Sequence, residues 1–233
     1  MNKFVHLGKL AKRESWGERS DMTISGRIFI ARHGETVFNV AGRMQGDKTD
    51  TPLTRRGFAQ ADAMGKGLAK WLGTKQSLQL WSSPSGRALQ TLAVIAEHID
   101  HDWHEATHDP RLHEINVGNW AGRNYAEIAK EIGRDFVDHD AGLFNVRPEG
   151  GEWYDEIAAR LTDWINETGS IGGDRLVLMH GMSSRVLRGL LLGLPVDPLW
   201  KAPIADGLPQ GTMVMIGGGE EKIIVLGGEA DHA

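Results

Sequence analysis

The stretch RIFIARHGET, residues 27–36, decides the fold. Its apolar run ends in Arg32-His33-Gly34, so a buried strand is expected to stop where a cationic pair begins. A second stretch, RLVLMHGMSS at 175–184, repeats the pattern with an apolar run that ends in His180-Gly181. The chain is therefore expected to bring a histidine to the tip of a buried strand twice.

Strand and helix patterns alternate along the chain. Strands are predicted at about 26–31, 77–83 and 174–180, and a terminal hairpin at 212–228. Helices are predicted at about 54–72 with Thr54 as N-cap, at 86–99, from near Asn124 to 132, at 150–168 and at 183–193. This order predicts an α/β fold, a three-layer sandwich with a mostly parallel central sheet and helices on both faces.

Polar side chains follow each of the three predicted strands. Arg32 and His33 follow the first, residues 82–87 follow the second and His180 follows the third. Because ligands of such sheets bind at the carboxyl ends of the strands, these groups are expected to converge. Gly34 and Gly181 are expected to let the backbone turn sharply and approach a ligand closely.

The chemistry of this set favours a tetrahedral oxyanion such as phosphate. Arginine forks at Arg32 and Arg87 can bind phosphate through parallel N–H···O bonds. Cationic neighbours also disfavour protonation of an imidazole, which keeps a nitrogen lone pair on His33 for attack. The helices that start near Gly86 and Ser183 are expected to add the dipoles of their N-termini.

Composition limits the other function classes. The 233 residues are 40% hydrophobic, carry a formal net charge of −5 and include no cysteine. No overall basic field is present for nucleic acid, and no apolar run approaches the roughly 20 residues that span a bilayer. We expect a cytoplasmic protein without nucleic-acid or membrane partners, with residues 1–22 as a dispensable extension and 23–233 as a single domain.

A histidine-rich tract at 97–114 resembles a metal-binding segment. It holds His98, His101, His104, His108 and His113, but no H-E-x-x-H order. Solvated histidines are the favoured interpretation. A zinc site made of His33, His180 and Glu114 is disfavoured because Arg32 and Arg87 would repel a dication.

Several motifs in order resemble the histidine phosphatase superfamily, also called phosphoglycerate mutase-like. They are RHGET, Asn39, Gln45, TPLTRRGFAQA, SSPSGRALQT, LHEINVGNWAG and LMHGMSSRVLRG, across roughly residues 26–225. The resemblance implies a phosphohistidine mechanism without a metal, in which His33 is the nucleophile and Glu114 is the proton donor. It also implies phosphate binding by Arg32, Arg87, His180 and Gly181, with Asn39 and Gln45 assisting near the mouth.

The resemblance also bears on the reaction. Glu114 is expected to begin protonated, in a secluded or anionic environment, so that it can protonate an alkoxide leaving group. The 66 positions between Glu114 and His180 resemble the phosphatase branch, because mutases carry a longer insertion. Residues at about 115–155 are expected to form a loop-helix lid that sets specificity.

The function that follows is a phosphomonoester hydrolase acting on a small phosphorylated metabolite. A cofactor-dependent phosphoglycerate mutase is the first alternative, and only then is 2,3-bisphosphoglycerate expected as a cofactor. A non-catalytic phosphate-binding module is the second alternative. No cofactor is otherwise expected, and a homodimer stays open.

Overall fold

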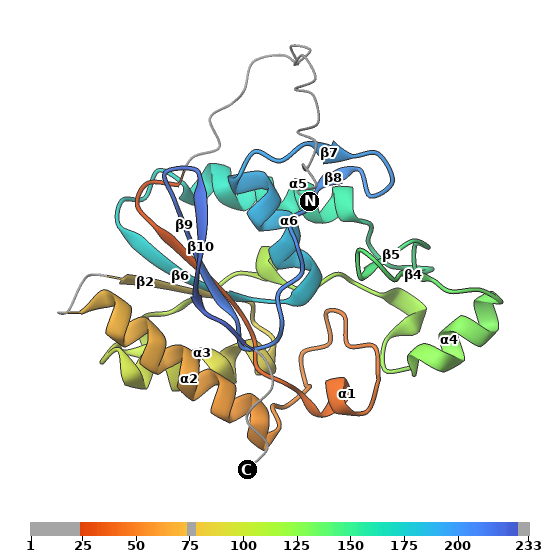
Figure 1. Cartoon of the computed structure of the whole chain (residues 1–233), viewed down its shortest axis with the longest axis horizontal. Helices are drawn as coiled ribbons and strands as arrows, with labels where there is room; N and C mark the ends of the chain where they lie inside the picture. Colours follow the sequence, from red (N-terminus) through yellow and green to blue (C-terminus); the bar gives the residue numbers. More distant parts are fainter. Residues whose placement is uncertain (1–23, 74–77, 228–233) are drawn as a thin grey trace, which may run out of the picture.

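The computed structural model describes residues 24–73 and 78–227, so the extension expected at 1–22 lies outside the described residues. A six-stranded sheet runs through the described part in the order β10-β9-β1-β6-β2-β3 (Figure 1). Its strands are β1 (Ile28–Arg32), β2 (Leu78–Ser82), β3 (Thr107–His108), β6 (Asp174–Met179), β9 (Met213–Gly217) and β10 (Glu220–Val225). β1, β6, β2 and β3 pair in parallel, while β9 pairs antiparallel with β1 and β10. The mostly parallel sheet is confirmed.

Apart from the short α1, the bounds of the α-helices agree closely with the predicted ones. They are α1 (Val37–Val40), α2 (Arg55–Leu72), α3 (Gly86–His98), α4 (Tyr125–Ile132), α5 (Tyr154–Thr168) and α6 (Gly181–Leu191). The 3-10 turns are η1 (Trp103–Glu105), η2 (Pro110–Leu112) and η3 (Gly118–Trp120). Two small ribbons pair β4 (Val137–Asp138) with β5 (Leu143–Phe144) and β7 (Val196–Asp197) with β8 (Ala202–Pro203). The sequence did not predict α1 or the ribbons, because elements this short show no periodicity.

Alternation along β1 explains the three layers. Phe29 and Ala31 belong to a buried cluster that includes Met64 of α2, together with residues of α3. Ile28 and Ile30 belong to the cluster on the other face, with residues of α5 and α6. Since successive strand residues point to opposite faces, the four apolar residues that begin β1 fit a sheet covered on both sides (Figure 1). The three-layer sandwich is confirmed.

Local capping fixes where the helices begin. The Thr54 hydroxyl accepts from the Gly57 amide at 3.1 Å, as expected for the N-cap of α2. α6 begins at Gly181, two residues before the predicted start, directly after β6. Its N-terminus is therefore held at the carboxyl edge of the sheet. Within the described residues, no helix has both the length and the apolar character to cross a bilayer.

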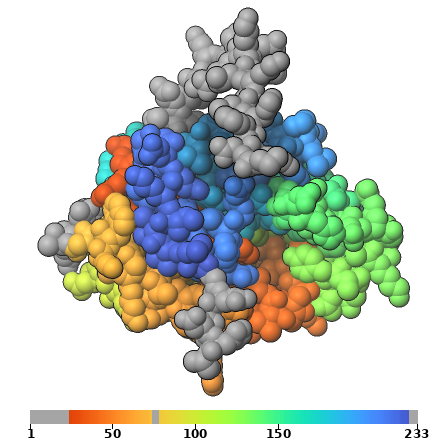
Figure 2. Space-filling model, in the orientation of Figure 1, coloured from red at the N-terminus to blue at the C-terminus, as the bar shows by residue number. Residues whose placement is uncertain are grey.

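The segments around α1 and α4 lie beyond the carboxyl ends of the strands (Figure 1) and adjoin each other on the surface (Figure 2, orange and green). Backbone hydrogen bonds join them. The Met44 amide donates to Arg123 O at 2.9 Å, Gly122 N donates to Met44 O at 2.8 Å, and Tyr125 N donates to Gly42 O at 3.2 Å. These bonds attach the predicted lid segment to the loop that follows β1.

Candidate active site

The ends of β1 and β6 place two histidine rings side by side. The His33 amide donates to Met179 O at 3.2 Å, which continues the pairing of β1 with β6 by one residue. The rings of His33 and His180 then lie 5.2 Å apart between centroids. Their exposed fractions are 3% and 0%, so both rings are buried in protein.

His33 is held as a neutral imidazole. Its Nδ1 lies 2.7 Å from Gly34 O, and since a carbonyl only accepts, Nδ1 carries the proton. Burial lowers the pKa of His33 well below its usual range, and the charges of Arg87 and Arg32 lower it further. The remaining nitrogen, Nε2, therefore keeps its lone pair at neutral pH.

Arg87 is fully buried and mostly satisfied by protein acceptors. Its Nε donates to His180 Nδ1 at 3.2 Å, and its Nη1 donates to Lys48 O at 2.6 Å and to Thr51 Oγ1 at 2.9 Å. Its Nη2 donates to Gly46 O at 2.6 Å, so four of the five guanidinium N–H groups are used. Burial lowers the pKa of Arg87 to about 10, which leaves it a cation at neutral pH.

Arg32 has more donors to spare. Its Nη1 donates to Leu208 O at 2.5 Å, while its Nε is buried with no hydrogen-bond partner among the described residues. A Cβ at Gly181 would lie 3.2 Å from Arg32 Nη2, so Gly181 leaves room for the guanidinium. Unpaired buried donors on a cation are what an anionic ligand would satisfy.

Gly34 has a different reason to be glycine from the expected one. A Cβ at Gly34 would lie 2.3 Å from Gly57 O, in the first turn of α2. Close packing of the loop against a helix backbone therefore demands glycine here. The expectation that Gly34 serves ligand approach is not what the structure indicates.

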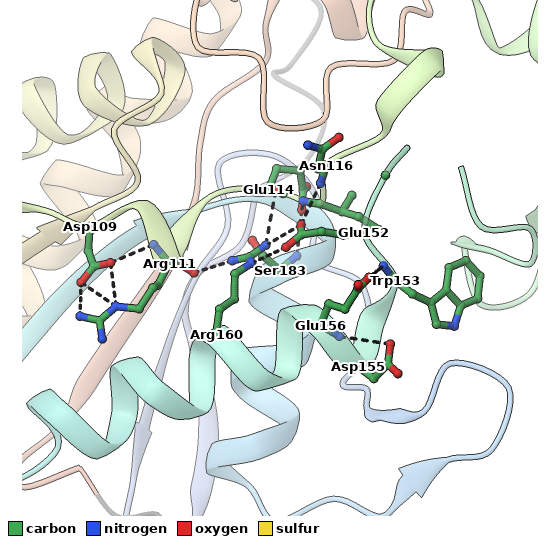
Figure 3. A network of polar contacts seen from close by, with 12 residues as sticks. Asp109, Arg111, Glu114, Asn116, Glu152, Trp153, Asp155, Glu156, Arg160 and Ser183 are labelled. Carbon is green, nitrogen blue, oxygen red and sulfur yellow. Dashed lines mark hydrogen bonds and ion pairs between the residues drawn. The ribbon is translucent and has the colours of Figure 1, made fainter. Parts of the chain in front are cut away.

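Glu114 lies opposite the strand ends, on a segment without regular structure at 113–117. Its carboxylate accepts from the Met182 amide at 3.0 Å, the Ser183 amide at 2.9 Å and its neighbour Ile115 at 3.0 Å (Figure 3). The first two amides belong to the N-terminal turn of α6, which favours negative charge. The Glu114 carboxylate is therefore surrounded by amide donors, whereas secluded or anionic surroundings were expected.

A cavity of about 370 Å³ unites these groups. Of the residues that the sequence singled out, it is lined by Arg32, His33, Asn39, Gln45, Arg87, Glu114 and Gly181. His180 is not among the lining residues, and its Nδ1 accepts from Arg87 Nε. We call Arg32, His33 and Arg87, together with the neighbouring ring of His180, the floor.

Asn39 and Gln45 are both fastened to Thr36. The Thr36 amide donates to Asn39 Oδ1 at 3.0 Å in the capping box of α1. The Thr36 hydroxyl lies 2.8 Å from Gln45 Oε1. With their oxygens held by Thr36, both side chains line the cavity beside the floor.

Sequence reasoning missed the individual residues of the cavity wall. We define the wall by its large apolar and aromatic members, Phe38, Met44, Val117, Tyr125 and Phe144. Tyr125 comes from the first turn of α4 and is 40% exposed. Val117, Tyr125 and Phe144 lie in the predicted segment 115–155, and Val117 also lies in the motif LHEINVGNWAG, whereas no sequence signal pointed to Phe38 or Met44.

The histidine tract forms no metal centre. Within residues 24–73 and 78–227, no cluster of three or more His, Asp or Glu side chains is arranged to hold a metal ion. His98 Nε2 lies 2.7 Å from Asp62 Oδ1, and His101 Nε2 lies 2.7 Å from Leu78 O. His104 and His108 are exposed as expected, whereas His98 and His101 have protein partners.

Comparison with known proteins agrees with this geometry. The histidine phosphatase superfamily (branch 1) matches residues 28–225, and the chain belongs to this phosphoglycerate mutase-like superfamily. A glucosyl-3-phosphoglycerate phosphatase of Mycolicibacterium vanbaalenii is 33% identical over 82% of this chain and 84% of its own. A probable phosphoglycerate mutase GpmB of Yersinia pestis is 31% identical over 72% of this chain and 76% of its own.

Solved structures show the same architecture. A mycobacterial glucosyl-3-phosphoglycerate phosphatase in complex with VO3 superposes with a TM-score of 0.68 at 26% identity, covering 87% of this chain and 98% of that one. A protein from Escherichia coli described as a putative α-ribazole-5′-P phosphatase shares the fold with a TM-score of 0.64 at 23% identity, covering 88% of this chain and 100% of that one. With its family and its phosphatase relatives, this chain is a phosphoric monoester hydrolase of the histidine phosphatase kind.

Proposed function

We propose that this enzyme hydrolyses a small phosphomonoester through a phosphohistidine formed on His33. The observation that carries the proposal is the bond from His33 Nδ1 to Gly34 O, which leaves Nε2 as the nucleophile at the cavity floor. Nε2 attacks phosphorus, the P–O bond to the alcohol breaks, and the alcohol leaves with a proton from Glu114. Water then attacks the phosphohistidine and releases inorganic phosphate.

The floor supplies charge for the phosphoryl oxygens. Arg32 has unpaired donors for them, whereas Arg87 has one N–H left. His180 accepts from Arg87 at Nδ1, so its own proton is on Nε2, which now lies 3.3 Å from Ser85 Oγ. That N–H is a second donor that phosphate binding can recruit. Preorganised donors of this kind stabilise the charge that develops in phosphoryl transfer.

Glu114 suits both proton transfers because three backbone amides donate to its carboxylate. In the first step its carboxyl group gives a proton to the leaving oxygen. Once the alcohol has taken the proton, the amides of Met182 and Ser183 stabilise the carboxylate. That carboxylate can then accept a proton from the attacking water.

The wall supports a substrate whose alcohol part has an apolar or ring-shaped face. Phe38, Tyr125 and Phe144 offer aromatic surface. Among the described residues, Arg43 is the one cation that lines the cavity outside the floor, and its Nη1 donates to Gly122 O at 3.1 Å. The relative named glucosyl-3-phosphoglycerate phosphatase supports testing glycosylated phosphoglycerates first.

The mutase alternative rests on the relative named as a probable phosphoglycerate mutase. A mutase must bind a carboxylate and two phosphoryl groups. Outside the floor, Arg43 alone among the described lining residues is a cation, which is little positive charge for that task. Isomerisation of 3-phosphoglycerate that rises with added 2,3-bisphosphoglycerate would favour this alternative. Release of inorganic phosphate without isomerisation would favour the hydrolase.

The proposal is tested by trapping the intermediate. We expect rapid-quench samples with an aryl phosphate to contain an acid-labile phosphoryl group, mapped by mass spectrometry to His33. The variant His33→Asn should lose both label and turnover, and EDTA should change neither in the wild type. Turnover without a phosphoryl-enzyme, or label on another residue, would overturn the proposal.

A further inference from the structure

An ion pair outside the cavity is built around the segment that carries Glu114. Arg160 of α5 and Glu152, just before α5, face each other with Nε–Oε1 at 2.9 Å and Nη2–Oε2 at 3.3 Å (Figure 3). Their side chains are 17% and 25% exposed, so the pair is largely withdrawn from solvent. Two parallel contacts of this kind fix both side chains in one geometry.

Both partners then bond to the backbone on either side of Glu114. Arg160 Nη1 donates to Arg111 O, and its Nη2 donates to the backbone oxygen of Glu114 at 3.4 Å. Glu152 Oε2 accepts from the Asn116 amide at 2.9 Å. The pair therefore contacts the chain before, at and after Glu114.

The same segment has further contacts, since the amides of Met182 and Ser183 donate to the Glu114 carboxylate. Residues 113–117 form neither helix nor strand, and the Glu152 amide donates to Asn116 O at 2.9 Å, which joins the segment to the residues before α5. Close packing adds one constraint, because a Cβ at Gly151 would lie 2.5 Å from Asn116 O. The pair and this contact hold residues 149–152 against the segment that carries Glu114.

We propose that the Arg160–Glu152 pair is a positioning device for Glu114, which sets the distance between its carboxyl group and the leaving-group oxygen. The proposal rests on the proposed role of Glu114 as proton donor. Neither Arg160 nor Glu152 lines the cavity, so they act through Glu114 rather than on the substrate. Displacement of a catalytic group by about 1 Å can cost roughly 10²-fold in rate.

The test compares an alkyl phosphate with an aryl phosphate whose leaving group needs no proton. We expect Arg160→Met to lower kcat on the alkyl phosphate by roughly 10- to 100-fold, with KM nearly unchanged, and on the aryl phosphate by less than about threefold. Glu152→Gln should show the same selectivity and provides a second variant should Arg160→Met fold poorly. Equal losses on both substrates, or no loss on either, would overturn the proposal.

A control pair uses another glutamate of the same helix. Arg147, before α5, pairs with Glu156 of α5 at 2.8 Å and donates to Gly151 O, but both side chains are about half exposed and neither bonds to residues 111–117. Arg147→Met should therefore keep wild-type kcat on both phosphates. A selective alkyl loss in this control would mean that any Arg–Glu pair on α5 has the effect, against the proposal.

A double variant separates this proposal from the proposed function. In a Glu114→Gln background, Arg160→Met should cause no further loss on the alkyl phosphate, because there is no acid left to position. Additive losses would contradict positioning. If Glu114→Gln alone slows both substrates equally, the proton-donor role fails; if Glu114→Gln is selective and Arg160→Met is not, only the positioning role fails.

Discussion

Two regions meet at the active-site cavity, and they hold their side chains in different ways. The floor stands on the ends of β1 and β6 and on the first turn of α3, where Arg87 is tied down by four hydrogen bonds. The wall stands on α1, α4, β5 and the loops that carry Met44 and Val117, and its members contribute mainly apolar surface. The floor is therefore suited to recognise what all phosphomonoesters share, and the wall to recognise how they differ.

The buried histidines of the floor and an exposed histidine elsewhere have opposite pKa shifts. Burial lowers the pKa of His33 and His180 in the floor well below the usual range. The exposed His139, between α4 and α5, has the opposite shift, because its hydrogen bond to the Asp135 carboxylate raises its pKa. A neutral floor histidine can attack or donate, whereas the neighbours of His139 favour its protonation.

The largest expected effect belongs to the floor. Arg32→Met should lower kcat/KM by about 10³-fold on every phosphomonoester, since the lost donors serve the phosphoryl oxygens themselves. Steady-state kinetics with an aryl, an alkyl and a sugar phosphate would measure it, with Arg147→Met as the unaffected control. A loss confined to one substrate would indicate that Arg32 recognises the alcohol part of the substrate rather than the phosphoryl group.

The convergence of the floor residues could be predicted from the sequence because the pairing of the strands determines where their ends lie. Apolar runs that end in Arg32-His33 and in His180-Gly181 are each visible locally, and parallel pairing then brings the two ends together. His180 does not line the cavity, and its Nδ1 accepts from Arg87, which also donates to Gly46 O and Lys48 O. Its role in binding phosphate stays a prediction.

The wall could not be predicted residue by residue. Tyr125 reaches the cavity because its amide donates to Gly42 O, across a gap of more than eighty residues, and no period or motif encodes that bond. The amide donors of Glu114 were hidden for the same reason, since Met182 and Ser183 lie 68 and 69 positions away. The segment 115–155 could be named, but its contacts could not.

A second, smaller effect concerns stability against pH. Because His33 and His180 have lowered pKa values, the native state binds fewer protons than the unfolded state below about pH 6.5, and stability falls as pH falls. We expect the free energy of unfolding to drop between pH 7.5 and 5.5, by at most about 1.4 kcal/mol for each of the two histidines, measured by denaturant titration. The exposed His104→Asn should keep this drop, whereas His33→Asn should roughly halve it. Unchanged stability across that range would mean that the floor tolerates charged imidazoles.

The smallest expected effect belongs to the wall and tests the comparison most directly. Tyr125→Ala should lower kcat/KM for 1-naphthyl phosphate about tenfold through a higher KM, because aromatic surface against the substrate ring is lost. Glycerol phosphate has no such ring, so its kcat/KM should change less than about twofold. Tyr125→Phe keeps the ring and should stay close to wild type on both, which separates the ring from the hydroxyl. Equal losses on both substrates would show that Tyr125 assists phosphoryl transfer itself, and the division between floor and wall would have to be redrawn.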